Sequence, residues 1–280
     1  MSNARRWQCD LKTYHADKTA VSHSGLDLVL DDPAEFYHER LAGNERESKP
    51  WFEEGQSLED ALLGGDGPLG SNLVVIPEDV LDARGARSGA KWKKFEAANK
   101  GKMLLKADDD IVRQVQEILR HDAARELFEA EGTKQETIVW HNDKHGVDVR
   151  ARFDFIHIGA EVVVDLKSTR TAATLQDCSN ESAKWGYHRQ AALYSEAVEE
   201  FYGIRPHFIF VFSSKKAPTY RVQTFELSEE FLEIGAQQND EALATYAECR
   251  RTGLWLPKEH GRIKTVPPPA YLRFWKSWRA

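Results

Sequence analysis

The feature that most constrains the fold is the hexapeptide at residues 162–167, which reads VVVDLK. Three β-branched residues before an alternating charged and apolar pattern are typical of a strand buried on both faces of a sheet. Successive side chains of a strand point to opposite faces, so Asp165 and Lys167 share one face while Leu166 points into the core. A buried carboxylate and a buried ammonium are costly alone, so this strand requires compensating groups beside it.

A second carboxylate, Asp154, lies eleven residues upstream at the end of the segment RARFD. Residues 147–158 favour a strand, and a tight turn at 157–160 returns the chain into the strand at 161–166. We therefore expect Asp154 to meet Asp165 and Lys167 on one sheet face. Two carboxylates and the backbone carbonyl of Leu166 suit a hard divalent cation, and we predict Mg²⁺, with Mn²⁺ able to replace it.

This set of groups is suited to hydrolysis of a phosphodiester bond. Mg²⁺ polarises a phosphoryl oxygen, lowers the pKa of a bound water and neutralises charge that develops on the leaving oxygen. Lys167 would either orient or deprotonate the attacking water, and the sequence leaves both roles open. The tripeptide D-x-K is common, and its plain alternative is a structural Asp–Lys pair.

Two further elements strengthen the prediction of a site. Gln190 and Tyr194 are four residues apart on a helix expected at 182–201, so they share one face. Upstream, a short helix expected at 56–63 presents Glu59 as a further metal ligand, with His15 or His23 as substitutes if that helix is misplaced. The plain alternatives are a surface glutamine, a core tyrosine and a solvated glutamate.

Several polar residues flank the predicted site and are candidates for contacting DNA phosphates. Arg150 and Arg152 are expected on the side of Asp154, with ion pairs to Glu161 or Asp148 as the equally weighted alternative. The residues just beyond the lysine are candidates for the next phosphate. They are Ser168, Thr169 and Arg170.

The rest of the chain favours one α/β domain with a mixed central sheet. We expect a helical N-terminal part at 1–130, a catalytic core at 131–255 and a tail at 256–280. Helices are predicted at 26–30, after a cap at Ser22 or Ser24, and at 33–41, 108–128 and 228–251, with strands at 137–140, 208–213 and 221–226. Residues 43–54 are predicted as a loop, and the basic segment 83–101 as mobile or facing DNA. Trp275 and Trp278 in the tail are expected to pack on the protein rather than on a base.

Composition sets wider limits. The chain has 280 residues, 41% hydrophobic and 30% charged, which is ordinary for a protein with a sizeable core. Its apolar runs are too short to span a membrane, and the N-terminus does not resemble a secretory signal, so we expect a cytoplasmic protein. Cys9, Cys178 and Cys249 lack a metal-binding spacing and are expected to be reduced thiols. The net charge of −7 neither proves nor excludes a DNA partner.

Several segments together resemble the C-terminal nuclease domain of the exonuclease VIII (RecE) group, in the RecB-like branch of the PD-(D/E)XK superfamily. The segments are YH at 14–15, SHSGL at 22–26, DDP at 31–33, RARFD at 150–154, DLKST at 165–169 and YHRQAALY at 187–194. Phe153 replaces the family's usual proline, and Glu59 stands where exonuclease VIII carries a histidine.

The resemblance implies a restriction-endonuclease-like core and a Mg²⁺-dependent exonuclease that acts 5′→3′ on double-stranded DNA ends. It also implies a ring-shaped homotetramer that leaves a 3′ single strand for an annealing protein in recombination. Two alternatives stay open: an endonuclease with the same core, and an inactive fold that only binds DNA. A hydrolase of small molecules would need histidine ligands that the motif lacks.

Overall fold

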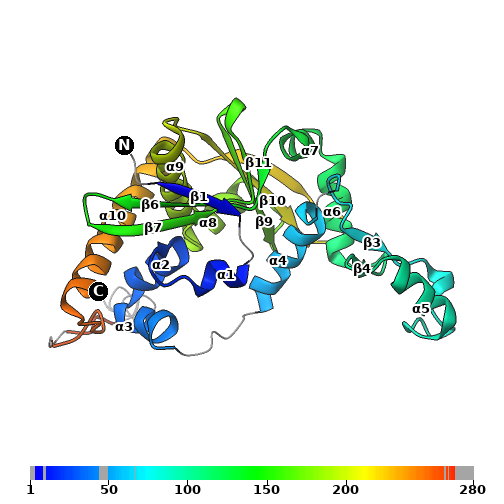
Figure 1. The fold of residues 1–280 in the computed structure, drawn as a ribbon, viewed down its shortest axis with the longest axis horizontal. Coiled ribbons are helices and arrows are strands. Elements are labelled where there is room, and N and C mark those ends of the chain that lie inside the picture. The colour runs from blue at the N-terminus through cyan, green and yellow to red at the C-terminus, as the bar shows by residue number, and fades with distance from the viewer. Residues whose placement is uncertain are drawn as a thin grey trace, which may run out of the picture.

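The structure, a computed structural model, describes residues 4–8, 11–43, 50–65, 67–261, 263 and 265–268. It has a mixed α/β architecture in which helices flank sheets, as expected from the sequence (Figure 1). A five-stranded sheet has the order β11-β10-β9-β8-β5, with β9 parallel to β10 and the other pairs antiparallel. Its strands are β5 (Thr133–Lys134), β8 (Phe155–His157), β9 (Val162–Thr169), β10 (His207–Ser214) and β11 (Val222–Glu226).

A four-stranded sheet adjoins it, in the order β1-β6-β7-β2. It consists of β1 (Arg5–Gln8), β2 (Val21–Ser22), β6 (Glu136–Asn142) and β7 (Val147–Arg152). β2 pairs with β7 in parallel and the other pairs are antiparallel. The sequence did not lead us to expect β1 or β2, because strands of four and two residues are too short to show a period.

The central strand β9 separates two hydrophobic cores. On one face Val163 packs with Phe208, Phe210 and Phe212 under helices α9 (Tyr187–Tyr202) and α10 (Glu229–Thr252). On the other face Val164 and Leu166 belong to a core formed with α4 (Pro50–Leu63), α6 (Asp110–Arg120) and α7 (Asp122–Glu129). The prediction that this strand is central and that Leu166 points into a core is therefore confirmed.

The strand predicted at 147–158 was wrong in one respect: it is two strands, β7 and β8, which belong to different sheets. The chain bends at Phe153 and Asp154, where the Phe153 N–H donates to the Glu136 carbonyl at 2.8 Å. The opposite strand of the hairpin bends at Gln135, between β5 and β6. The φ of Gln135 is 54°, and its N–H donates to the Asp154 backbone carbonyl at 3.0 Å. Both strands of the hairpin thus bend together where they cross from one sheet to the other.

Two long helices predicted from the sequence are each divided in the structure. The helix expected at 182–201 is α8 (Leu175–Lys184) followed by α9, with Gly186 at φ 69° between them. The helix expected at 108–128 is α6 followed by α7, which His121 caps by accepting from the Ala124 N–H at 3.2 Å. Periodicity continued across both breaks, so it could not locate them.

The N-terminal helices largely follow their predicted caps. Ser22 caps α2 (His23–Asp31), and Asp32 caps α3 (Pro33–Phe36), which continues into the π-helical turn Tyr37–Leu41. Helix α1 (Leu11–Ala16) was not predicted, and α4 begins at Pro50, within the segment predicted as a loop. Short 3₁₀ turns occur at Glu78–Val80 (η2) and Ile158–Ala160 (η3).

Residues 73–105 form a projection, here called the arm, that extends away from the sheets (Figure 1). It contains the parallel strands β3 (Leu73–Val75) and β4 (Met103–Leu105), the turn η2, and helix α5 (Gly89–Ala98). The basic segment at 83–101 therefore contains helix α5 and lies between the paired strands β3 and β4 in the chain. Trp275 and Trp278 lie outside the described residues. Within the described part of the chain, no helix combines the length and apolarity needed to cross a membrane.

Candidate active site

Asp165 and Lys167 lie on the face of β9 that packs against α9. The Asp165 side chain is 3% exposed and forms an ion pair with Lys167 through Oδ2. Its Oδ1 accepts a hydrogen bond from Gln190 Nε2 on α9 at 2.5 Å. The Lys167 ammonium also lies over the ring of Tyr187, 4.8 Å from its centre. The helix residue Gln190 therefore meets the strand carboxylate directly, as its predicted position requires.

Asp154 reaches the same strand from the bend between β7 and β8. Its Oδ2 accepts a hydrogen bond from the Leu166 N–H at 2.8 Å. β8 pairs with β9 only as far as the Phe155–Val164 pair, so Asp154 takes the place of a strand partner for Leu166. In a strand, the N–H and C=O of one residue point to the same side. The Leu166 carbonyl therefore faces the side on which Asp154 lies.

Glu59 approaches from α4 and is itself buried. Its Oε1 accepts from Gln135 Nε2 at 2.9 Å and from Arg152 Nη1 at 3.2 Å. Its negative charge is one of the two that raise the pKa of Asp154, which places Glu59 beside that carboxylate. The structure thus brings Glu59, Asp154 and Asp165 together from a helix, a bend and a strand.

The pKa values of Asp154, Glu59 and Lys167 are all raised. Burial, followed by the charges of Glu59 and Asp165, holds the pKa of Asp154 well above its usual range. Burial also raises the pKa of Glu59, although the Arg152 guanidinium opposes that effect. Burial alone would lower the pKa of Lys167, but the neighbouring Asp165 outweighs it and the net shift is upward. Lys167 is therefore held in its charged form.

These donors fit a hard divalent cation, because they are carboxylate and carbonyl oxygens whose mutual repulsion a positive ion would relieve. Among the described residues, no three His, Cys, Asp or Glu side chains form a preformed metal cluster. The reason is visible in the contacts: Glu59 faces Arg152 and Gln135, and Asp165 faces Lys167 and Gln190. Protein cations and amides occupy the carboxylates that would ligate the ion.

Tyr194 lies one turn after Gln190 on α9 but deeper in the protein. Its ring packs against Phe153, with ring centres 4.9 Å apart, and against Phe208. Burial, with smaller contributions from charges that include Asp165 and Asp154, holds the pKa of its hydroxyl well above the usual range. Tyr194 therefore packs against the bend next to Asp154, through Phe153.

The two arginines of β7 have different partners from those we predicted. Arg150 is buried, forms an ion pair with Asp17 at 3.5 Å, and lies over the Tyr14 ring. Arg152 pairs with Glu59 at 3.2 Å. Ion pairing with Asp148 or Glu161 is therefore wrong: Asp148 pairs with His141 instead, at 2.7 Å. Because the chain bends after β7, the alternation of side chains along β7 does not continue to Asp154. Alternation could therefore not predict where these side chains lie.

The three residues after Lys167 are divided among different surroundings. The Ser168 hydroxyl accepts from Gln114 Nε2 at 3.1 Å, and the Thr169 hydroxyl bonds that of Thr171 at 3.0 Å. Arg170 has a side chain that is 75% exposed and pairs with Glu54 at 3.2 Å. Of these three, Arg170 is the one placed to meet a ligand from solvent.

Sequence reasoning did not identify Gln135 as part of the site. Its side chain donates to the Glu59 carboxylate, and its backbone N–H donates to the backbone carbonyl of Asp154, so it links Glu59 to the bend that carries Asp154. An isolated glutamine between two short strands gives no signal of this role. His23, named above as a substitute ligand, bonds to the Gly186 carbonyl at 3.1 Å and pairs with Asp27.

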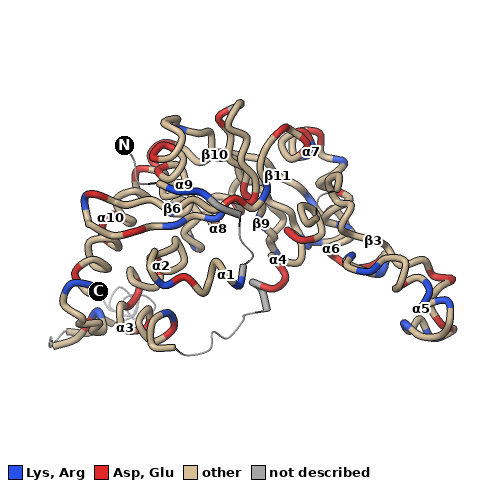
Figure 2. Tube along the Cα trace, in the orientation of Figure 1, with Lys and Arg blue, Asp and Glu red and all other residues tan. Residues whose placement is uncertain are grey.

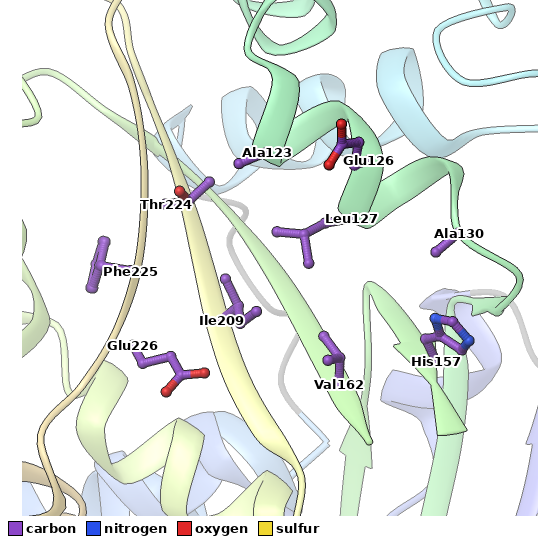
Figure 3. A pocket seen from close by; sticks show the side chains of 10 residues that line it. All are labelled: Ala123, Glu126, Leu127, Ala130, His157, Val162, Ile209, Thr224, Phe225 and Glu226. Carbon is purple, nitrogen blue, oxygen red and sulfur yellow. The ribbon is translucent and has the colours of Figure 1, made fainter. Parts of the chain in front are cut away.

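A pocket of about 570 Å³ lies elsewhere, between α7 and the strands β9, β10 and β11 (Figure 3). Leu127, Val162 and Ile209 line it, with Glu126 and Glu226 at its margin. Val162 points to the face of β9 opposite Asp165, because the two positions differ by an odd number. This hollow is therefore separate from the carboxylate site.

Comparison with solved structures gives the same architecture. A candidate exonuclease from Eubacterium rectale is 18% identical, with 96% of this chain and 98% of that chain covered at a TM-score of 0.60, which shows the fold. A phage-related exonuclease from Haemophilus somnus is 12% identical over 86% of this chain and all of that chain, but its TM-score of 0.37 carries no argument.

No curated protein matches this chain in sequence. A family model does match, over residues 82–266, which include the bend, β9 and α9 and exclude Glu59. The match covers well over half of the chain and confirms the resemblance to PD-(D/E)XK nucleases. The chain belongs to the family described as PDDEXK-like domain of unknown function (DUF3799).

Proposed function

We propose that this protein is a Mg²⁺-dependent exodeoxyribonuclease that degrades linear double-stranded DNA from its ends. The observation that carries the proposal is the contact of Asp165 with both Lys167 and Gln190, beside Asp154 and Glu59. Three carboxylates with a charged lysine are the groups that phosphodiester hydrolysis needs. The Leu166 carbonyl adds an oxygen donor on the same side.

Each residue has a role in this proposal. Glu59, Asp154, Asp165 and the Leu166 carbonyl hold Mg²⁺ or Mn²⁺, which when bound polarises the phosphate and activates a water. Lys167, which pairs with Asp165, orients the attacking water and offsets charge on the phosphate. Gln190 fixes the Asp165 carboxylate, and Arg170 is the candidate for the adjacent phosphate.

The finer statements rest on the resemblance to the exonuclease VIII group. These are 5′→3′ polarity, a 3′ single-stranded product for recombination, a ring-shaped homotetramer and an annealing partner. The cytoplasmic location, and the division into a helical part at 1–130, a core at 131–255 and a tail, rest instead on the sequence patterns described above. An endonuclease, and an inactive module that only binds DNA, are the alternatives that the test must separate.

The test incubates linear, circular, 5′-blocked and 3′-blocked duplexes with Mg²⁺ and the wild-type protein, Asp165→Ala or Lys167→Ala. We expect the wild type to degrade linear duplex, to be slowed by a 5′ block, and to leave circles intact, while both variants lose activity. Cleavage of circles would indicate the endonuclease. Binding without degradation by the wild type would indicate the inactive module, and full activity of both variants would refute the site.

A further inference from the structure

The arm carries a charge opposite to that of the rest of the molecule. Residues 73–105 contain seven Lys or Arg and four Asp or Glu, a net charge of +3, whereas the whole chain carries −7. The remainder of the chain is therefore at −10. Figure 2 shows the cations following the arm as it leaves the body. Such a separation of charge produces a local positive field on an otherwise acidic protein.

Most of the arm's cations have no counter-ion. Lys93, Lys94, Lys100 and Lys102 are exposed, and none of their side-chain ammonium groups makes an ion pair or hydrogen bond within the described part of the chain. Like charges this close repel one another and do not stabilise the helix that carries two of them. Repulsion within this cluster therefore lowers the stability of the protein on its own, and binding of an anionic partner would relieve that repulsion.

The arm's aromatic residues point inward. Trp92 is buried, with its ring centre 6.0 Å from that of Phe95, and the Arg87 guanidinium lies over it. Surfaces that bind single strands combine cations with exposed aromatic rings on which bases stack. Because the rings of α5 are used to build the arm, its exposed face offers charge alone. That chemistry matches the phosphate backbone of a duplex.

The arm joins the body beside helix α6, and α5 projects away from the sheets (Figure 1). A pocket of about 520 Å³ is lined by Arg170, Lys215 and Glu54 on one side and by Asp109 and Asp110 on the other. Arg170 follows Lys167 by three residues, and Asp109 follows the last residue of the arm, Leu105, by four residues. Glu54 pairs with both Arg170 and Lys215. The hollow therefore connects the end of β9 with the start of α6, which follows the arm in the chain.

We propose that the arm is a second DNA-binding surface, which holds the phosphate backbone of the duplex outside the site through Lys93, Lys94, Lys100 and Lys102. The inference deepens the proposed function and rests on it. Helix α5, with ten residues, is about 15 Å long, the length of roughly four base pairs of duplex. The arm contacts DNA that has yet to be cut, so it governs binding and not the chemical step.

The test compares two variants that lose the same charge. The arm variant is Lys93→Gln, Lys94→Gln, Lys100→Gln and Lys102→Gln, and the control is Lys144→Gln, Arg205→Gln, Arg250→Gln and Arg251→Gln on other exposed surfaces. Glutamine preserves side-chain length and helix propensity. Binding of a blunt duplex is measured by anisotropy at several salt concentrations, with Asp165→Asn added to each protein so that cleavage plays no part.

We expect the arm variant to bind duplex at least about tenfold more weakly, with a plot of log affinity against log salt shallower by about 3, since each phosphate contact contributes roughly 0.9. The control should match its parent.

Equal losses in both variants, unchanged duplex binding, or a loss confined to single strands would overturn the proposal. So would a change in oligomeric state by sedimentation with duplex affinity intact, because the arm would then bind a second copy. If Asp165→Ala and Lys167→Ala keep nuclease activity while the arm effect persists, the proposed function fails and the arm surface stands.

Discussion

The candidate site and the arm are both rich in charge, but they organise it in opposite ways. In the site, Asp165 is buried and contacts a cation and an amide, and Glu59 likewise contacts Arg152 and Gln135. In the arm, lysines such as Lys93 are exposed and lack counter-ions within the described residues. The protein therefore compensates its charge internally in one region and leaves it exposed to solvent in the other.

This difference determines how each region should respond to mutation. Removal of one member of a buried pair leaves the other desolvated and uncompensated, so effects in the site should be large and strongly coupled. Exposed cations interact weakly with one another through solvent, so effects in the arm should be small individually and should depend on salt. The predictions below test this contrast, starting with the largest effect.

Lys167→Met should have the largest effect, because it removes the charge that faces Asp165 and would face the phosphate. We expect nuclease activity to fall by roughly 10²–10³-fold, as for loss of one group that stabilises a transition state. The free energy of unfolding should fall by about 3 kcal/mol, since a buried carboxylate loses its cation. Initial rates on linear duplex and urea unfolding measure the two quantities.

The double variant Asp165→Asn, Lys167→Met is the control for that prediction. Neither side chain then carries a charge, so we expect most of the lost stability to return while activity stays absent. If the double variant is as unstable as the sum of the two single variants, the pair is not coupled and the contrast with the arm is refuted.

Glu59→Gln should have an intermediate effect. The amide keeps the shape and its hydrogen bond from Gln135 but loses the charge of a metal ligand. We expect activity at limiting Mg²⁺ to fall by about 10–100-fold, the range typical of groups that complete or orient a metal site, and to recover partly at higher Mg²⁺. Glu53→Gln is the matched control, because Glu53 lies at an exposed position of the same helix, α4. An equal loss in both variants would remove Glu59 from the metal site.

The sequence predicted those parts of the site that lie on regular structure. Asp165 and Lys167 follow strand alternation, so their shared face could be inferred from period alone. Helix spacing related Gln190 only to Tyr194, and its place beside the strand depended on the resemblance to a family. Glu59 depended on the resemblance to a family, and the structure places it beside Asp154.

What the sequence could not predict lies at the irregular points. The bend at Asp154 depends on Gln135 in a different segment, and the break at Gly186 depends on a left-handed backbone conformation, with φ 69°, between α8 and α9. The partners of Arg150 and Arg152 follow from that bend. Tertiary contacts set these features, and no local pattern contains them.

Asp154→Asn should change the stability of the protein less than Lys167→Met does, and in the opposite direction. Burial and the charges of Glu59 and Asp165 raise the pKa of Asp154, so the folded protein holds this proton more firmly than the unfolded chain. Stability without metal should therefore decrease as pH rises from the ordinary aspartate range through the raised pKa. The neutral amide avoids that loss, and we expect the metal-free variant to melt about 2–5 °C higher at neutral pH while losing activity.

The same melting curves include an internal check. Mg²⁺ should raise the melting temperature of the wild type, because the ion relieves repulsion among the carboxylates, and should raise that of Asp154→Asn much less. A variant that melts lower than the wild type at neutral pH in the absence of metal would show that the Leu166 hydrogen bond outweighs the repulsion.

Trp92→Ala should have the smallest effect on the global stability of the protein. Truncation of a tryptophan in a continuous core costs about 3–5 kcal/mol, and Trp140, which belongs to the core under α9, should show that cost. Trp92 is also buried, but it belongs to neither core cluster, and the arm meets the second core through Leu73 and Met103 at its base. We expect the global melting transition of Trp92→Ala to stay close to that of the wild type, while amide exchange accelerates within residues 73–105.

This last comparison decides whether the arm is an independent unit. Local exchange with an unchanged global transition means that the arm opens without the site, and duplex affinity should then fall while the rate on saturating duplex is kept. A loss of stability as large as that of Trp140→Ala would instead couple the arm to the core. The two charged regions would then fold as one unit, and an effect of arm variants on the rate of cleavage would follow from their effect on the sheet.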